Sequence, residues 1–223
     1  MEPELWVQIL LFVGVGYSVI LHEIAHALSA YWCGDDTAYL QRRISLSPVT
    51  HIHPVGTVLV PLLCVFTSSG VFFGWANPVP VNPRKLRHPI RDDIIVSLAG
   101  IVANLCIALL LCMMLPLLIS VGAISDGSSS RVLLIRLAFI NVFLALFNLL
   151  PVPPLDGSHV LKYVLPRGWR MSYERLGWSG VLILMALLWY RPLGFGSWVV
   201  ATVAHVVRFL LTLAGQFWSL FGI

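Results

Sequence analysis

The sequence predicts an all-α polytopic membrane protein, and composition, hydropathy and the grouping of apolar residues all favour this class. Of the 223 residues, 58% are hydrophobic and only 11% are charged, whereas about 25% are charged in ordinary soluble domains. The mean hydropathy is +0.89. A soluble protein of this length could not cover so much apolar surface. The apolar residues gather in long segments separated by loops that hold most of the charge.

The apolar segments are candidates for membrane crossing, because a helix needs about 20 apolar residues to cross the hydrocarbon core. Three of them, 5–33, 94–121 and 132–150, are credible spans by length alone. The segment 177–190 is short, and glycines and a proline frame it. It either crosses beside its neighbours or forms a hairpin with the last segment, 196–223. We therefore expect about five to six transmembrane segments.

The basic residues predict the orientation, because cytoplasmic loops carry an excess of Lys and Arg. The loops at 34–53, 84–93 and 162–175 contain most of these residues, whereas the N-terminus carries Glu2 and Glu4 and no basic residue. We expect a multi-pass protein of the cell membrane with its N-terminus outside and the three basic loops in the cytoplasm. The pI near 9.1 then reflects loops that flank the lipid bilayer, and we expect no nucleic-acid partner.

The segment 55–76 lies between two loops that this orientation puts on the same side, so it should not cross the membrane once. Prolines and glycines interrupt it, and its run VFF is typical of a strand. We interpret it as a helical piece followed by a re-entrant β-like loop. Such backbone at membrane depth must lie against protein or a water-filled cavity. The alternative is an ordinary kinked span and one misassigned loop.

His22, Glu23 and His26 form the motif HEIAH inside the first apolar segment. On a helix the two histidines lie about 40° apart around the axis, so both imidazoles can bind one metal ion. Glu23 sits beside them, where its carboxylate can accept a proton from the attacking water. Ionisable groups at membrane depth are costly and usually functional. Glu23 comes roughly 27 Å along the helix, which predicts a zinc hydrolase site within the bilayer, nearer the cytoplasmic face.

Asp156 is the leading candidate for a third metal ligand, because catalytic zinc sites usually have three protein ligands. Most other acidic residues lie in tails or loops, whereas Asp156 lies in FNLLPVPPLDGSHV, directly after an apolar segment. Prolines end that segment, and Gly157 allows a close turn. The alternatives for Asp156 are a helix N-cap or a buried salt bridge. His159 is the competing candidate for the third ligand, and His205 ranks below it.

These motifs resemble the site-2 proteases, zinc metalloproteases that cut inside the bilayer. HEIAH and NLLPVPPLDG carry the resemblance, together with SLSPVTHIHPVGTVLVPLL, GWANPVPVNPRKL and SLAGIVANL. It covers about residues 17–165 and points to the compact bacterial branch without a PDZ or CBS domain. The resemblance implies that His22, His26 and Asp156 bind one Zn²⁺ per chain, with Glu23 as catalytic base. It also implies a bundle around a three-helix catalytic core.

We therefore expect one membrane-embedded metalloprotease domain over 1–223, with a catalytic core at about 5–165 and C-terminal helices at about 172–223. The sequence departs from the family pattern at two positions. Family members often have proline in place of Ile101, a change that should only alter a helix start. Many compact members have aspartate in place of His53, which here adds a titratable imidazole near the site.

Two asparagines in apolar segments, Asn104 and Asn148, could stabilise the transition state as oxyanion donors. An amide that lacks a partner in such surroundings is costly. The alternative for either is a hydrogen bond between helices.

Four further polar residues could contact substrate. Asn77 and Asn82 could bind the backbone of an extended substrate along a strand-like element at about 70–81, or they could satisfy the loop's own turns. His51 and His53 could cover the cleft, contact substrate or act as a pH-sensitive gate. The alternative is that both are solvated loop histidines near the headgroups.

The expected function is that of an intramembrane zinc metalloendopeptidase, which hydrolyses peptide bonds within transmembrane segments during regulated intramembrane proteolysis. By resemblance, its substrates would be single-span membrane proteins or remnant signal peptides; the sequence indicates neither the substrate nor the oligomeric state. One alternative is a non-proteolytic zinc-binding membrane sensor or transporter, which would not need Glu23. Another is a scaffolding protein with a degenerate motif, which would bind no stoichiometric zinc.

Overall fold

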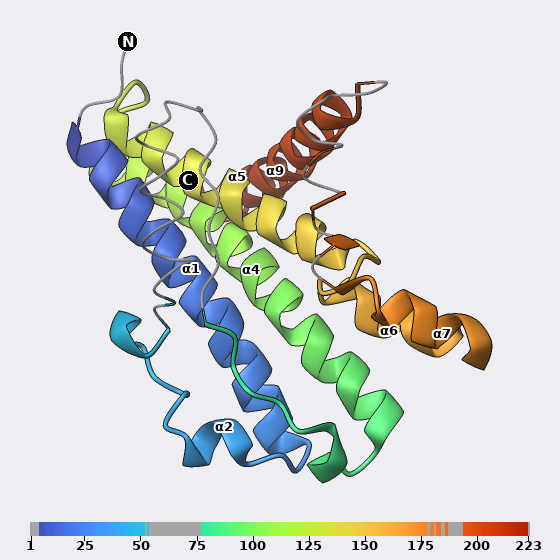
Figure 1. Cartoon of the computed structure of the whole chain (residues 1–223). Coiled ribbons are helices and arrows are strands. Elements are labelled where there is room, and N and C mark those ends of the chain that lie inside the picture. The colour runs from blue at the N-terminus through green and yellow to red at the C-terminus, as the bar shows by residue number, and fades with distance from the viewer. Residues whose placement is uncertain are drawn as a thin grey trace. The chain divides into compact units, whose positions relative to one another are not determined.

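The computed structural model describes residues 5–51, 53, 77–177, 179–180, 182–183, 186 and 194–222. Within these ranges the chain is helical and contains no strand, as the all-α prediction requires (Figure 1). The elements are α1 (Leu5–Trp32), α2 (Thr37–Leu40), the 3-10 turns η1 (Pro48–Thr50) and η3 (Pro83–Lys85), α4 (Pro89–Ser120), α5 (Ser129–Leu149), α6 (Gly157–Val164), α7 (Arg167–Glu174) and α9 (Phe195–Ser219).

Four helices in the described ranges are long and apolar enough to cross a membrane. They are α1, α4, α5 and the part of α9 from Gly196 to Ser219. Helices α1, α4 and α5 match the three segments predicted to span by length, and α9 lies in the last apolar segment, as expected of a polytopic membrane protein. The segment 55–76 lies entirely outside the described residues, and more than half of 177–190 lies outside them. The predicted total of five to six spans therefore stays a prediction.

The predicted re-entrant β-like loop also lies mostly outside the described residues. Of the strand-like element expected at about 70–81, the structure describes residues 77–81, which form irregular backbone without a strand. Figure 1 shows the segment 77–85 running along the C-terminal half of α1.

Helix α4 begins at Pro89, earlier than its apolar segment. Proline suits the first helical position because its missing N–H would have no partner there. The buried Asp92 carboxylate accepts a hydrogen bond from the backbone N–H of His88 (2.8 Å) and so caps the start. Ile101 is buried in the interior of α4. The expectation that this position alters a helix start was therefore wrong, since the helix begins well before it.

The chain divides into two compact units, Gly16–Gly100, and Met1–Val15 together with Ile101–Ile223. In the second unit α5 packs against α9. Their shared core holds three buried valines, Val142, Val203 and Val207, together with the small Ala108 of α4. The prediction of one domain over 1–223 stays a prediction.

The unit Gly16–Gly100 is built on the C-terminal half of α1. Ala27 and Ala30 are fully buried and lie on one face of this helix. Ala27 packs in a cluster with Val79, and Ala30 packs in another with Leu86 and Val96. The small alanines let the segment 77–86 and the start of α4 lie close to α1.

The proline cluster ends α5 and places Asp156 at the start of the next helix. Helix α5 stops at Leu149, as the prolines predict, and α6 begins at Gly157. A Cβ atom on Gly157 would lie 2.1 Å from the carbonyl oxygen of Leu149. Only glycine therefore fits this turn, and the sequence-based reason given for Gly157 is confirmed.

We predict that Gly157→Ala destabilises the fold by about 1–3 kcal/mol, because the added methyl group would overlap backbone that must then shift. Thermal unfolding of the purified protein in detergent measures this loss. Gly168→Ala in α7 is the matched control, since a Cβ there meets nothing within 4 Å. Equal unfolding temperatures for the two variants would contradict the prediction.

Candidate metal centre

His22 and His26 form a buried pair on α1. Their side chains are 7% and 9% exposed, and the two Nε2 atoms lie 3.0 Å apart. Two nitrogens bound to one tetrahedral zinc at about 2.0–2.1 Å would be roughly 3.3 Å apart. The pair is therefore spaced to share one zinc ion, and the motif HEIAH on one helix face has the predicted geometry.

The main chain of α4 fixes the orientation of His26. Its Nδ1–H donates a hydrogen bond to the carbonyl oxygen of Val96 at 2.7 Å. Because Nδ1 carries the proton, the lone pair of the ring is on Nε2, the atom that faces His22. Metal-binding histidines commonly donate their second ring nitrogen in this way, and the bond fixes both tautomer and ring orientation.

Gly100 of α4 provides the space for both imidazoles. A Cβ atom at this position would lie 2.5 Å from His22 Cε1 and 2.5 Å from His26 Nε2. No larger residue fits without displacing a ring. Sequence reasoning did not single out Gly100. A signal existed, because glycine inside a helix is unfavourable relative to alanine and often marks close packing.

Glu23, the predicted base, is held by the segment 77–82. Its Oε2 accepts a hydrogen bond from the backbone N–H of Val79 at 2.8 Å. Hydrogen bonds to an ionised group are stronger than neutral ones. The bond therefore fixes the carboxylate beside the two histidines.

Two other charged side chains anchor the segment 77–82. Arg43 donates to the carbonyl oxygens of Asn77 (2.5 Å) and Thr50 (2.6 Å). The fully buried Asp35 accepts at Oδ2 from the backbone N–H of Asn82 (2.6 Å). Sequence reasoning grouped Asp35 with the loop acids and missed this role. The spacing Asp-x-Thr could have indicated it, because Asp35 also accepts from the N–H of Thr37.

A surface ion pair lies next to this anchor. Lys85 Nζ lies 2.5 Å from Asp36 Oδ1. The hydrogen bond from Lys85 holds the pKa of the Asp36 carboxyl below its usual value. Both side chains are exposed, so the pair supports the loop only weakly.

Asp156 occupies the N-cap position of α6, but its side chain makes no capping hydrogen bond. The N-cap alternative therefore does not explain this carboxylate. The rival ligands have other contacts: His159 Nδ1 accepts from Lys162 at 3.0 Å, and the exposed His205 donates to Ala201 O in its own helix at 2.7 Å. Asp156 belongs to the unit with Ile101–Ile223, and its joining of the histidine pair stays a prediction.

The two asparagines proposed as oxyanion donors differ in their surroundings. Asn104 is 1% exposed, and neither polar atom of its amide has a partner among the residues that the structure describes. Asn148 donates through Nδ2 to Leu144 O within its own helix at 3.1 Å. The described residues thus provide no helix–helix hydrogen bond for Asn104, and a role at the transition state stays a prediction for both.

The loop residues serve mainly local structure. Asn82 Oδ1 accepts from the N–H of Arg84 (3.1 Å) and caps η3, the turn alternative expected from sequence. The N–H of Asn77 donates to His51 O (2.8 Å).

His51 is 2% exposed and its Nε2–H donates to Ser45 O (2.9 Å), so the solvated alternative is wrong for this histidine. His53 is half-buried. Contact with substrate stays a prediction for all four.

We predict that Gly100→Ala lowers the zinc content of the purified protein, because the new methyl group would occupy the space of both imidazoles. Metal analysis by mass spectrometry measures the zinc-to-protein ratio. Gly16→Ala, in the same helix as the histidines, is the control, since a Cβ there meets nothing within 4 Å. A full zinc complement in Gly100→Ala would show that the close approach is not needed.

Comparison with known proteins points to one family. The model of Peptidase family M50 matches residues 118–189. The "Putative zinc metalloprotease YwhC" of Bacillus subtilis (strain 168) is 38% identical over 183 residues, which cover 79% of this chain and 78% of that protein. The "Putative zinc metalloprotease Rip2" of Mycolicibacterium smegmatis is 28% identical over 227 residues, covering 93% and 84%. No solved structure matches the chain.

Proposed function

We propose that this chain, which belongs to peptidase family M50, the site-2 proteases, hydrolyses peptide bonds within the transmembrane segments of other membrane proteins. The family and the names of the relatives support a zinc metalloprotease. The observation that carries the intramembrane proposal is the buried histidine pair, 3.0 Å apart at Nε2, on a helix long and apolar enough to cross a membrane.

In this proposal His22, His26 and Asp156 hold the zinc ion, one per chain. Two imidazole nitrogens and a carboxylate oxygen are a usual donor set for catalytic zinc. The hydrogen bond from His26 to the carbonyl of Val96 supports the role of His26 as a ligand. When bound, zinc lowers the pKa of water and polarises the scissile carbonyl.

Glu23 is the general base in this scheme. The Val79 N–H holds Oε2, and Oε1 has no hydrogen bond among the residues that the structure describes. Oε1 is therefore available to accept the proton of the attacking water. Glu23 then delivers that proton to the leaving amine.

The substrate must expose its peptide bonds, because a transmembrane helix hides them in its own hydrogen bonds. Single-span membrane proteins and remnant signal peptides are the proposed substrate class. The irregular segment 77–82 offers a backbone that an unwound substrate could join as an added strand. Asn77 and the adjacent loop histidines would then lie at the substrate's side.

The proposed orientation follows from the loop charges. The N-terminus lies outside, and the basic loops 34–53, 84–93 and 162–175 lie in the cytoplasm. The motif HEIAH is close to the C-terminal end of α1, which favours a site nearer the cytoplasmic face. Water would reach the site from that side.

A zinc sensor or transporter is the second candidate, and it would not need a positioned base. The hydrogen bond that holds Glu23 beside the histidines favours the protease. A scaffolding role is less favoured, because the donor set and the base are intact.

We predict that Glu23→Gln abolishes cleavage, with a loss of at least about 100-fold for removal of a general base, and retains zinc. The assay incubates reconstituted protein with a panel of single-span substrates and locates cuts by mass spectrometry. Glu174→Gln, which removes an exposed carboxylate paired with Arg170, is the control. Retained cleavage in Glu23→Gln would overturn the protease mechanism.

We predict that Asp156→Ala loses most of its bound zinc, whereas His159→Ala keeps it. Removal of one of three donors weakens the site, while His159 is already engaged with Lys162. The zinc content of both variants, measured after dialysis against buffer, decides whether Asp156 or His159 is the third ligand. The opposite pattern would identify His159 as the ligand.

A further inference from the structure

Arg42 has a backbone conformation that is unusual for its residue type. Its φ is +55°, and it is the one non-glycine residue with positive φ in the part of the chain that the structure describes. The N–H of Arg43 donates to Ala38 O and that of Arg42 to Tyr39 O, both at 2.9 Å. These two bonds form a Schellman motif, which places Arg42 at the position that glycine usually takes after a helix. Strained backbone of this kind often marks a functional position.

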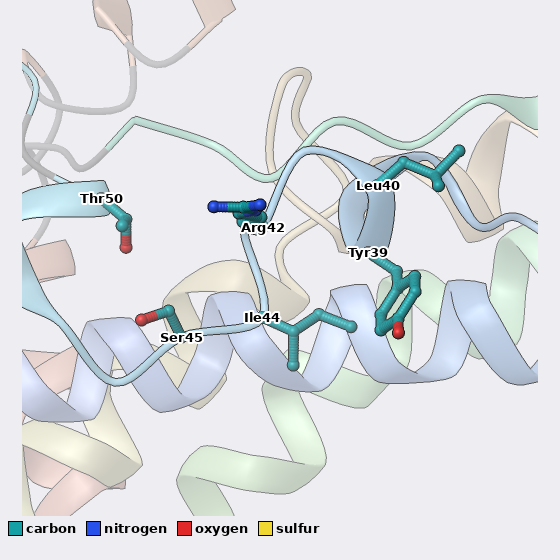
Figure 2. Close-up of a pocket in the computed structure, with 6 residues that line it drawn as sticks. All are labelled: Tyr39, Leu40, Arg42, Ile44, Ser45 and Thr50. Carbon is teal, nitrogen blue, oxygen red and sulfur yellow. The ribbon is translucent and has the colours of Figure 1, made fainter.

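Arg42 lines a pocket of about 630 Å³ in the unit Gly16–Gly100 (Figure 2). Its exposed guanidinium makes no hydrogen bond or ion pair with any described residue, in contrast to Arg43, which is bonded to backbone carbonyls. The other lining residues combine hydroxyl groups with apolar and aromatic surface: Tyr39, Leu40, Ile44, Ser45 and Thr50.

The hydroxyl of Ser45 adds a donor to this cation. Ser45 Oγ accepts from the N–H of Ser47 at 3.1 Å, which leaves its own hydrogen for a further partner. A guanidinium fork and a hydroxyl donor that line one pocket match the oxygens of a phosphate group. The pocket therefore has the chemistry of an anion site with an apolar wall.

The pocket lies where the first span ends. Helix α1 ends in Tyr31 and Trp32, which are 45% and 72% exposed. The Tyr31 ring contacts the pocket residue Tyr39, with 5.3 Å between ring centroids. Aromatic residues in this arrangement are typical of the membrane interface. Leu40 and Val49 are 65% and 76% exposed, which suits contact with lipid better than contact with water.

We propose that this pocket binds the headgroup of an anionic phospholipid. The phosphate contacts the Arg42 guanidinium and the Ser45 hydroxyl, and the acyl chains lie against the exposed apolar side chains around the pocket. Basic groups next to a span are attracted to anionic lipid surfaces. Glycine would adopt the positive φ of position 42 without strain, but it has no guanidinium group to contact the phosphate.

The test measures binding of phosphatidylglycerol and phosphatidylcholine to the purified full chain in detergent. We expect the wild type to prefer phosphatidylglycerol, and we expect Arg42→Gly to weaken that binding about fivefold, as loss of one basic contact implies. Binding of phosphatidylcholine should not change. Arg42→Gly should unfold at the same or a higher temperature, because glycine accepts positive φ. Arg42→Gln should lose binding equally without that gain in unfolding temperature.

Arg167→Gln is the matched control, because it removes an exposed arginine at the start of α7. It should leave phosphatidylglycerol binding unchanged. An equal loss in this control, or full binding by Arg42→Gly, would overturn the proposal. Inorganic phosphate and a soluble acidic peptide are the further probes. If either binds as tightly as phosphatidylglycerol and depends on Arg42 in the same way, the pocket takes a soluble anion or a peptide, and the lipid proposal is wrong.

Discussion

The hydrogen bond from His26 to the carbonyl of Val96 is the interaction on which the candidate site depends. His26 can present its Nε2 lone pair only while a carbonyl takes the proton on Nδ1. That carbonyl belongs to α4, so α4 must come close to α1 at this level. Gly100 permits the approach, because a side chain there would overlap both imidazoles. In the unit Gly16–Gly100, the close packing of α4 on α1 therefore also sets the orientation of the two histidines.

The segment 77–82 shows how irregular backbone can be held without a sheet. Buried backbone groups need partners, and here charged side chains supply them. Arg43 binds the carbonyls at one end, Asp35 binds an N–H at the other, and Glu23 binds Val79 between them. The proposed base is thus part of the scaffold that orders the segment proposed to receive substrate. A shift of this segment would change the position of the Glu23 carboxylate.

Features that depend on short stretches of sequence could be predicted. Three of the four described candidate spans follow from apolar length, the paired histidines follow from helical spacing, and the end of α5 follows from its prolines. Features that depend on packing between distant stretches could not. Asp35 binds the backbone of Asn82 and the carbonyl of His51 accepts from Asn77, and these partners, far along the chain, could not be read from the local sequence. Ile101 was misplaced for a different, local reason, since the polar first turn of α4 concealed where that helix begins.

We propose that two histidines and one carboxylate bind one zinc ion. X-ray absorption at the zinc edge of the purified protein tests it most directly, because about 2.0–2.1 Å separates zinc from nitrogen and oxygen ligands and about 2.3 Å separates it from sulfur. We expect one zinc per chain with a four-coordinate shell of light atoms that includes two imidazoles. A sulfur ligand, a single imidazole or the absence of stoichiometric zinc would contradict it.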